Sequence, residues 1–485
     1  TYARLPESFY ASVAPTPVAA PRLLRLNRSL AEHLRLDPEA LASAEGLAVL
    51  AGNRVPDGGA PIAMAYAGHQ FGHFVPSLGD GRAVLIGEVV DRDGVRHDIH
   101  LKGAGRTPYS RMGDGRAALG PVLREYVVSE AMAGLGIPTT RALAMIATGE
   151  SVLREGPQPG AILVRTAASH VRVGTFEYFY RRGDIESVRT LADYVIARHY
   201  PHCADAGEPY RALLDEVVAR QADLVARWLL VGFIHGVMNT DNTSVAGETI
   251  DYGPCAFMDT YHPQTVYSSI DIGGRYAYDQ QPNVALWNLV QLAQCLLPLL
   301  ADEEAAAVRS ATDAVNGYAP EFQRRYGAGL RAKLGLAEER EGDRELALEL
   351  LRVMAEQRAD FTNTFRRLCD AAAGEAQSER PVRELFDDAE PFDAWAARWR
   401  ERLDAEQRSP QQRCESMRAV NPAYIPRNHR VQQAIDAASR DEPDLEPLDR
   451  LLAVVSRPFD DHPGLDDHTR PPQPHEVVQQ TFCGT

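Results

Sequence analysis

Residues 233–259, FIHGVMNTDNTSVAGETIDYGPCAFMD, constrain the fold of this chain more than any other stretch. They bring an amide and a carboxylate, Asn242 and Asp251, close together in the sequence. We expect residues 243–245 and 248–250 to form two short strands around the turn Ala246-Gly247. Both polar side chains would then lie at strand ends on one rim, as a metal-phosphate site requires.

Kinases present their two magnesium ligands in this order: an Asn ends the catalytic loop, a short hairpin follows, and an Asp-aromatic-Gly triplet closes it. In small-molecule kinases the loop also carries an Asp that orients the acceptor hydroxyl. Here the loop reads HGVMNTDN, with Val237 in that place and a different acid, Asp241, directly before Asn242. Because an aliphatic side chain cannot accept a proton, we predict a kinase-like nucleotide site with an altered reaction.

The composition limits the kinds of partner. A formal net charge of −16 argues against a nucleic-acid partner, although a local basic cleft could still hold nucleotide phosphates. The 45% hydrophobic and 24% charged residues are typical of a soluble globular protein with a large core. Asn and Gln interrupt the most apolar stretch, residues 284–301, at helical spacing, so we expect a buried amphipathic helix and no membrane partner.

The N-terminal and cysteine patterns indicate the compartment. No basic region followed by an apolar one opens the sequence, so we predict no secretory signal. The 6 cysteines are scattered without a Cys-x-x-Cys pair, which favours a reducing compartment and excludes a Cys-rich zinc site. We therefore expect a cytoplasmic protein.

A glycine-rich turn is the first candidate for nucleotide contact. Gly79 and Gly81 precede Arg82 and a predicted strand at residues 83–90. Glycines let backbone amides approach phosphate oxygens, and the arginine adds positive charge. Taken alone, so short a motif is more simply a plain hairpin turn. For the nearby His69 and His73, packing or loop hydrogen bonds explain the residues better than metal binding does.

A second predicted strand ends at Lys102, because apolar and polar residues alternate from residue 97 to residue 102. The helix predicted at residues 121–135 carries Glu125 and Glu130, and either could pair with Lys102 and hold its ammonium against phosphate. A single Lys or Glu is more simply a solvated surface residue. The order of glycine turn, strand, Lys strand and Glu helix nevertheless matches the N-lobe of kinases.

Further phosphate contacts are predicted from glycines and arginines. Asp114 and Gly115, in a Gly- and Arg-rich connector, could form a second phosphate-facing turn or simply a flexible loop. Arg165 and Arg172 each follow an apolar, strand-like run, and a guanidinium fork matches phosphate geometry. The alternative for these two is a pair of surface arginines.

The rest of the chain is predicted to be mainly helical. We predict helices at residues 22–34, 38–51, 186–198 and 209–234, and a largely helical region at residues 284–456. Strands at residues 142–147 and 161–165 would complete a five-stranded lobe. The Pro-broken loop NPAYIPRNH, residues 421–429, could fold back on the site.

Taken together, these motifs resemble the selenoprotein O family of pseudokinases, in its bacterial form with Cys near the C-terminus. The resemblance covers residues 2–485 and is carried by YAGHQFGHF, LGDGRA, LKGAGRTPYSR, DGRAALGPVLREY, LVRTAASHVRVGTFEYF, HGVMNTDN, DYGPCAFMD and NPAYIPRNH. It implies an α+β, protein-kinase-like two-lobed fold. We expect an N-terminal extension at residues 1–60, a small β-rich N-lobe at 61–185, a larger helical C-lobe at 186–300, and a helical C-terminal region and tail at 301–485.

The resemblance also implies a reaction and a set of site residues. ATP would be held in reversed orientation, and AMP rather than phosphate would pass to Ser, Thr or Tyr hydroxyls of other proteins; UMP transfer with Mn²⁺ is a variant of this reaction. By position, the family's nucleotide contacts match Gly79, Gly81, Arg82, Lys102, Asp114, Gly115, Arg165, Arg172 and Asp251, with Glu125 as the partner of Lys102. Its ligands for Mg²⁺ or Mn²⁺ match Asn242 and Asp251, and its proton acceptor matches Asp241.

Two other functions fit the residues. The chain could be a phosphotransferase in which Asp241 replaces the missing loop acid and the γ-phosphate is transferred, or a non-catalytic ATP-binding scaffold. The resemblance also suggests a redox role for Cys483, through a disulfide with a thiol such as Cys255. The family's terminal Cys-Ser-Ser is Cys-Gly-Thr here, which departs from that pattern.

Overall fold

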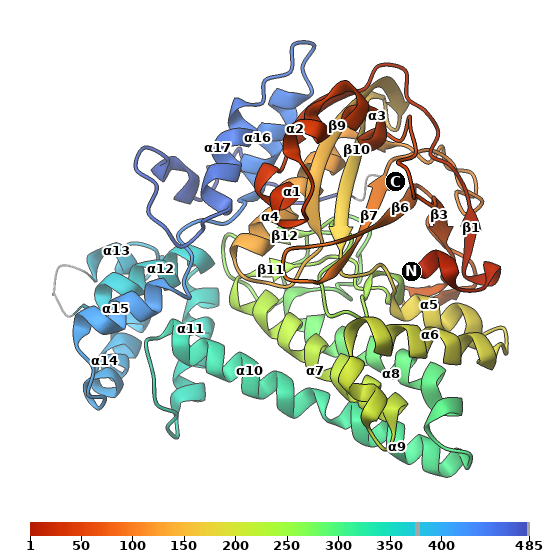
Figure 1. Cartoon of the computed structure of the whole chain (residues 1–485). Helices are drawn as coiled ribbons and strands as arrows, with labels where there is room; N and C mark the ends of the chain where they lie inside the picture. The colour runs from red at the N-terminus through yellow and green to blue at the C-terminus, as the bar shows by residue number, and fades with distance from the viewer. Residues whose placement is uncertain (374–378, 483–485) are drawn as a thin grey trace.

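One antiparallel sheet dominates the upper part of the molecule (Figure 1), in a computed structural model that describes residues 1–373 and 379–482. Its strand order is β1-β3-β6-β7-β10-β9-β2, and β8 pairs with β10 off this path. The strands are β1 (Tyr10–Ser12), β2 (Arg22–Leu26), β3 (Ile62–Met64), β6 (Ala83–Val90), β7 (Arg96–Lys102), β8 (Ala117–Ala118), β9 (Arg141–Leu153) and β10 (Pro157–Ala167). The sheet is larger than the predicted five strands because three strands from the N-terminal region join it.

The hairpin of β6 and β7 sets the geometry of the site. In its turn, Asp91 Oδ1 accepts hydrogen bonds from the backbone N–H groups of Asp93 and Val95, and Gly94 takes the left-handed conformation. The resulting register places Ala83 opposite Lys102. The glycine-rich turn before β6 therefore lies beside the lysine at the end of β7.

Helices cover both faces of the sheet. The first group, α1 (Arg28–His33), α2 (Pro38–Ala42) and α3 (Ala44–Leu50), packs with Ile99 and Leu101 on one face. The second group, α4 (Leu119–Gly134), α16 (Asn428–Ala438) and α17 (Glu446–Val455), covers the other face around β9 and β10. Because side chains alternate along a strand, His100 and Lys102 point away from the side of Leu101.

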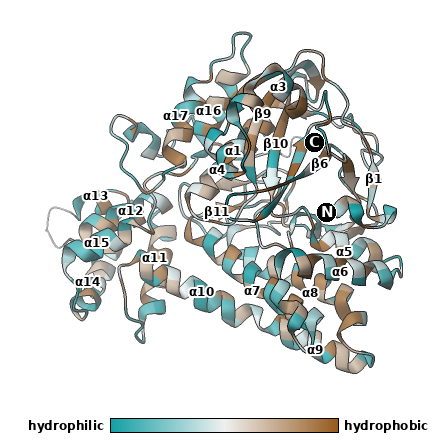
Figure 2. Ribbon diagram, viewed as in Figure 1, coloured by the Kyte–Doolittle hydropathy of each residue, from teal (hydrophilic) through white to brown (hydrophobic). Residues whose placement is uncertain are grey.

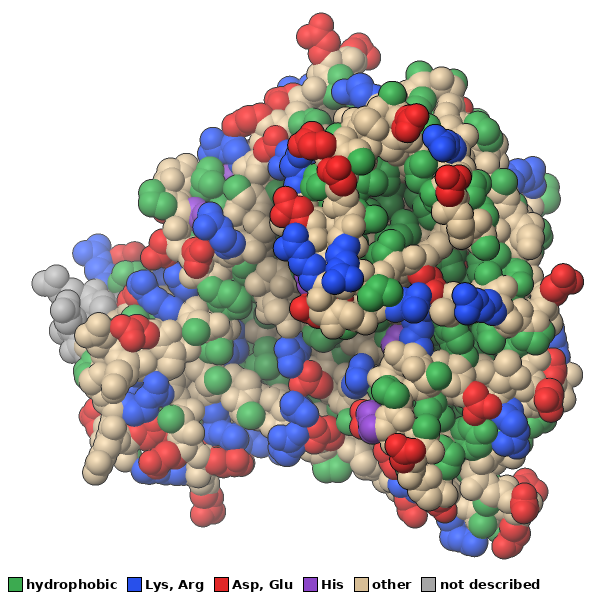
Figure 3. Space-filling model, in the orientation of Figure 1, with side chains coloured by type: hydrophobic (Ala, Val, Ile, Leu, Met, Phe, Trp, Pro, Cys, Tyr) green, Lys and Arg blue, Asp and Glu red, His purple; other side chains and the backbone are tan. Residues whose placement is uncertain are grey.

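The lower part of the molecule is helical (Figure 1). Its helices are α5 (Val173–Tyr180), α6 (Ile185–His199), α7 (Pro209–Leu230), α8 (Gln281–Leu300), α9 (Glu304–Asn316), α10 (Tyr318–Lys333), α11 (Asp343–Glu356), α12 (Phe361–Ala371), α13 (Arg380–Arg383), α14 (Glu390–Asp404) and α15 (Pro410–Arg418). Figure 2 shows hydrophobic residues concentrated in the interior, whereas the outlying α14 and α15 carry more hydrophilic residues. On the face shown in Figure 3, acidic and basic side chains are interspersed, so the acidic excess forms no single patch there.

Helix α8 is the buried apolar helix predicted from residues 284–301. Among the described residues, one helix, Tyr278–Leu300, is long and apolar enough to cross a membrane by length and composition alone. Half of its most apolar window is buried, and α8 packs against α5, α7 and α9. The core helices of globular domains share these properties.

Several predicted elements differ in the structure. The helix predicted at residues 22–34 is wrong: β2 comes first, and Asn27 then caps α1 by accepting a hydrogen bond from the Leu30 N–H. The helix predicted at residues 38–51 breaks at Ser43, which caps α3. Helix α7 ends at Leu230, because the chain continues as β11 (Phe233–Ile234), which pairs with β12 (Ala256–Phe257). Helix α5 was not predicted. The fold is thus a mixture of an antiparallel sheet and many helices.

Candidate functional site

Lys102 connects the sheet to two carboxylates. Its Nζ donates to Glu125 Oε2 on α4 at 2.5 Å and to Asp251 Oδ1 at 2.5 Å. Lys102 and Glu125 are both buried. The other candidate partner, Glu130, binds Arg141 instead, so the structure selects Glu125. The predicted strand-and-helix order therefore brings a buried ammonium next to the 251–253 segment.

Asp251 has an unusual backbone and a strongly perturbed carboxylate. Its φ of 63° lies in the left-handed region, which Asp tolerates better than most residues do. Burial alone would raise the pKa of Asp251, but the charges of Lys102, Arg165, Arg82 and Arg172 lower it well below the usual value. A quarter of the side chain is exposed, since its relative accessibility is 25%. The ionised carboxylate can therefore be reached by a cation.

The hairpin predicted between Asn242 and Asp251 is wrong. Ser244 forms an antiparallel bridge with Arg172, and Thr249 forms a parallel bridge with Thr139. The two segments therefore pair with different neighbours rather than with each other, because the chain before α5 and the chain after α4 supply better-placed backbone partners. The loop before Ser244 still contacts the Thr249 segment, since the His235 ring lies 2.9 Å from the Ile250 carbonyl.

Asn242 and Asp251 offer oxygen ligands suited to a hard divalent cation. Asn242 lies in the 3-10 turn Thr240–Asn242, and its Nδ2 donates to the Val237 carbonyl at 3.0 Å. This bond leaves the amide oxygen of Asn242 without a donor among the described residues. An amide oxygen and an ionised carboxylate are the donor set that Mg²⁺ and Mn²⁺ prefer, so these residues fit such an ion.

Asp241 is a buried carboxylic acid with one oxygen unused. Among the described residues its Oδ1 has no hydrogen-bond partner, and its Oδ2 accepts only a long bond of 3.4 Å from Gln70. Burial raises the pKa of Asp241 to about 7, against the opposing charge of Arg172. A Cβ at Gly68 would lie 2.5 Å from Asp241 Oδ1, so the acid is closely enclosed. An acid with a pKa near neutrality is suited to accept a proton.

Arg165 and Arg172 are buried, so the alternative that they are surface arginines is wrong. Arg165 Nη1 donates to Glu125 Oε1 at 3.2 Å. Arg172 lies at the N-terminus of α5, where its Nη1 donates to the Asp241 carbonyl at 2.8 Å and its guanidinium lies 4.4 Å from the Tyr66 ring centroid. The positive charges of both arginines lower the pKa of Asp251, the predicted metal ligand.

The glycine-rich turn packs against a neighbouring loop. A Cβ at Gly79, whose φ is +67°, would lie 2.3 Å from the Tyr109 ring, and a Cβ at Gly81 would lie 2.9 Å from the Tyr109 carbonyl oxygen. Ser110 Oγ donates to the Gly81 carbonyl, and Thr107 Oγ1 donates to the Asp80 carbonyl at 2.6 Å. The glycines are therefore required by local packing, whatever ligand the turn binds.

Gly79→Ala is expected to destabilise the protein by about 1–3 kcal/mol, because the new methyl group meets the Tyr109 ring at a backbone conformation that alanine disfavours. Thermal unfolding measures the effect. Gly87→Ala on β6 is the matched control, since a Cβ there meets nothing within 4 Å. Unchanged stability of Gly79→Ala would show that packing does not require this glycine.

Asp114 and Gly115 form a turn whose Gly115 carbonyl accepts a hydrogen bond from the Gly105 N–H at 3.0 Å. The Asp114 carboxylate accepts hydrogen bonds from Arg154 at 2.9 and 3.1 Å, and a Cβ at Gly115 would overlap the Gly105 carbonyl oxygen. Neither residue hydrogen-bonds to Lys102 or Asp251 in the described part of the chain. Their nucleotide contacts stay a prediction.

The C-terminal region packs along the segment that follows the site. Arg427, in the NPAYIPRNH loop, donates to Asp259 Oδ1 at 2.5 Å, and Asn428 donates to the Phe257 carbonyl at 2.9 Å. Thr481 Oγ1 donates to the Pro254 carbonyl at 2.6 Å. Burial raises the pKa of the adjacent Cys255 to about 12. Cys483, the predicted redox residue, lies outside the described residues.

Sequence reasoning missed two residues of the site, Asp80 and His100. Asp80 lies between the two glycines of the turn and is buried, as is His100 on β7. The alternation that predicted β7 contained the signal, because it placed Asp98 and His100 on the same side of the strand as Lys102. His69 behaves as expected from packing, with its ring bonded to Glu177.

Comparison with known proteins identifies the family. A family model described as "Protein adenylyltransferase SelO" matches residues 1–456. The chain belongs to the SelO family. It is 63% identical over 485 residues, 100% of this chain and 98% of the relative, to a "Protein nucleotidyltransferase YdiU" of Rhodopseudomonas palustris (strain BisB5). A protein of the same name in Bradyrhizobium sp. (strain ORS 278) is 61% identical over the same shares of the two chains. The resemblance seen in the sequence motifs is thereby confirmed.

Proposed function

We propose that this protein is a nucleotidyltransferase that moves AMP from ATP to Ser, Thr or Tyr hydroxyls of other proteins. Membership of the SelO family supports the class of reaction. The observation that carries the proposal is the ion pair between Lys102 and Asp251, whose pKa is also lowered by the charges of Arg165, Arg82 and Arg172. A region with this excess of positive charge suits a triphosphate better than a neutral ligand.

In the proposed site, one group of residues stabilises the charge of the phosphates and another residue accepts a proton. Lys102, Arg165 and Arg172 would bind the phosphates and stabilise the charge that develops on departing pyrophosphate. Asn242 and Asp251 would hold Mg²⁺ or Mn²⁺, which supplies further charge stabilisation when bound. Gly79, Gly81 and Arg82 border the Lys102 end of the same region, while Asp114 and Gly115 would act from the adjoining loop.

Asp241 would accept the proton of the attacking hydroxyl. Its Oδ1 has no hydrogen-bond partner among the described residues, and a pKa of about 7 balances ionisation against basicity. Val237 occupies the position of the usual kinase acid and is buried. Asp241, rather than a residue at position 237, would then orient the attacking hydroxyl. This different position of the acid supports attack at the α-phosphorus instead of the γ-phosphorus.

The kinase-like division into two lobes remains part of the proposal. The arrangement of a sheet above a helical region is compatible with it (Figure 1). The boundaries at residues 60, 185 and 300 belong to the same proposal, as does the expectation of a cytoplasmic location.

Labelled ATP distinguishes the candidate reactions. The protein is incubated with Mg²⁺ or Mn²⁺, a mixture of acceptor proteins, and ATP labelled at either the α- or the γ-phosphorus. We expect label on protein only from the α position, because AMP transfer keeps that phosphorus and releases the other two.

The other outcomes are equally informative. Label retained from the γ position alone would show phosphotransfer and overturn the proposal. No label from either position, despite measurable ATP binding, would favour a non-catalytic scaffold. Omission of the divalent cation is expected to abolish labelling, which tests the metal requirement within the same experiment.

A further inference from the structure

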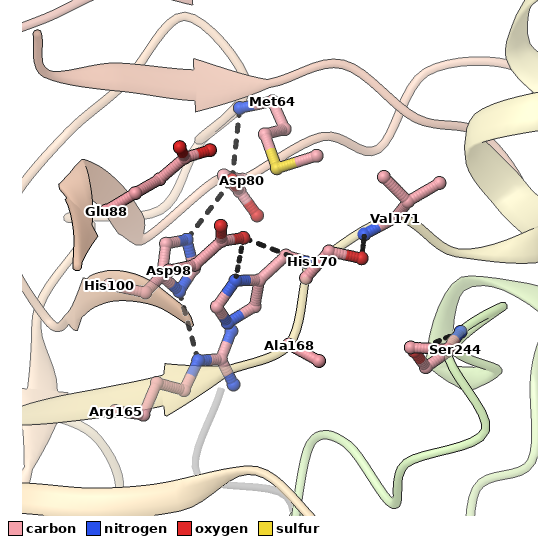
Figure 4. Close-up of polar contacts among 12 residues, drawn as sticks. Met64, Asp80, Glu88, Asp98, His100, Arg165, Ala168, His170, Val171 and Ser244 are labelled. Atoms are coloured by element: carbon pink, nitrogen blue, oxygen red, sulfur yellow. Dashed lines mark hydrogen bonds and ion pairs between the residues drawn. The ribbon is translucent and has the colours of Figure 1, made fainter. Parts of the chain in front are cut away.

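His100 is a buried imidazole that bridges an acid and an arginine (Figure 4). Its Nε2 lies 3.2 Å from Asp80 Oδ2, and its Nδ1 lies 3.0 Å from Arg165 Nε. The β7–β10 register places His100 and Arg165 directly opposite each other. The imidazole therefore contacts the guanidinium of Arg165, one of the proposed phosphate-binding groups.

The contact with Arg165 fixes the tautomer of His100. A guanidinium Nε–H can only donate, so Nδ1 of His100 must carry a lone pair and no proton. The proton of the neutral ring is then on Nε2, where it is donated to Asp80. If His100 took up a second proton, its Nδ1–H and the Nε–H of Arg165 would be two donors that face each other. Burial together with Arg165 lowers the pKa of His100 to about 4, although Asp80 opposes this shift.

The three guanidinium nitrogens of Arg165 have different surroundings. Its Nε is held by His100, and its Nη1 donates to Glu125, the partner of Lys102. Its Nη2 has no acceptor among the described residues. A guanidinium held at two nitrogens has lost most of its rotational freedom. The orientation of its third nitrogen, Nη2, is therefore fixed as well.

Asp80 connects the same network to the second arginine. Its Oδ2 also accepts a hydrogen bond from the Met64 N–H at 3.0 Å, and its Oδ1 lies 3.8 Å from Arg172 Nη2. Burial alone would raise the pKa of Asp80, but His100, Arg172 and the Met64 N–H lower it below the usual value. Asp80 is part of the glycine-rich turn. The ionised Asp80 carboxylate thus links the turn to Arg172 directly and to Arg165 through His100.

We propose that His100 is a positioning residue for ATP: as the neutral Nε2–H tautomer it couples Asp80 of the glycine-rich turn to Arg165 and so aims that guanidinium at the phosphates. This role rests on the proposed function for its substrate and goes beyond it by naming a residue that touches no reacting atom. His100 acts through Arg165, and the tilted ring of His170 packs against it with 4.2 Å between the ring centroids.

Two polar variants separate the two contacts of the ring. His100→Asn keeps an acceptor near the Nδ1 position for Arg165, whereas His100→Gln keeps a donor near the Nε2 position for Asp80. We expect His100→Gln to raise the KM for ATP by about 10- to 100-fold, the usual consequence of losing a hydrogen bond to a charged group, with a smaller change in kcat. His100→Asn is expected to raise the KM for ATP less than His100→Gln does, because Arg165 keeps its acceptor and only the contact with Asp80 is lost.

A double-mutant comparison tests whether the effect passes through Arg165. In the Arg165→Met background, His100→Gln should cause little further loss of ATP affinity, because the group that His100 aims is already gone. His97→Asn is the matched control: it removes a similar His–Asp contact on the same strand, with a ring-to-carboxylate distance of 2.8 Å to Asp91, without touching Arg165. We expect ATP affinity to be unchanged in the control.

Equal losses in His100→Asn and His100→Gln, matched by equal drops in melting temperature, would show a merely structural role and overturn the inference. So would multiplicative losses in the Arg165→Met background. Nitrogen NMR of the imidazole is an independent check, and protonation at Nδ1 would contradict the proposed tautomer. Direct ATP-binding measurements keep this test separate from the proposed function, since they do not require AMP transfer.

Discussion

Asp251→Asn is expected to reduce AMP transfer by about 1000-fold or more, because it removes both the charge of a proposed metal ligand and the anion that Lys102 binds. Asparagine is the informative replacement, since it tolerates the left-handed backbone found at this residue. Alanine would add backbone strain to the chemical change. Transfer of α-labelled AMP to acceptor proteins measures the effect, and circular dichroism with thermal unfolding checks the fold.

The control for this variant is Asp215→Asn, which removes an exposed carboxylate paired with Arg211 on α7. An exposed pair of this kind contributes little to stability, so activity and melting temperature should both be unchanged. A folded Asp251→Asn protein that transfers AMP at the normal rate would remove Asp251 from the site. The metal assignment would fail with it.

Asp241→Asn is expected to lower kcat by about 100- to 10,000-fold, the range typical of losing a general base, while ATP binding is retained. The amide matches the carboxylate in size, so it fits beside Gly68, but it cannot take a proton. Parallel measurements of ATP affinity and of transfer rate separate the two effects. Loss of ATP affinity without loss of kcat would show that Asp241 serves binding and not proton transfer.

Much of the β-rich part could be predicted from the sequence. Strand β6 matches its predicted residues, and alternation located β7 up to Lys102. These strands form a local hairpin, so their periodicity and turn chemistry act together. The Lys102–Glu125 pair was also predictable once the family's motifs were aligned, because each residue lies on a well-defined element.

Non-local pairing could not be predicted in the same way. Residues 243–250 have the composition of a hairpin, but Ser244 pairs with Arg172 and Thr249 pairs with Thr139. Residues 22–26 have helical periodicity and yet join the sheet edge beside β9. In both cases the partner lies far away in the sequence, and local propensity carries no information about it. Asp80 and His100 escaped notice because their roles depend on burial that only the assembled sheet creates.

If Asp251 holds the metal as proposed, its ion pair with Lys102 would make metal binding and ATP binding interdependent. A divalent ion arriving alone would face an ammonium already seated on the carboxylate that it needs, and the two positive charges would repel. The triphosphate supplies the negative charge that lets both cations share this space. By thermodynamic reciprocity each ligand would then tighten the other, so the enzyme would favour the preformed metal–ATP complex over either component separately.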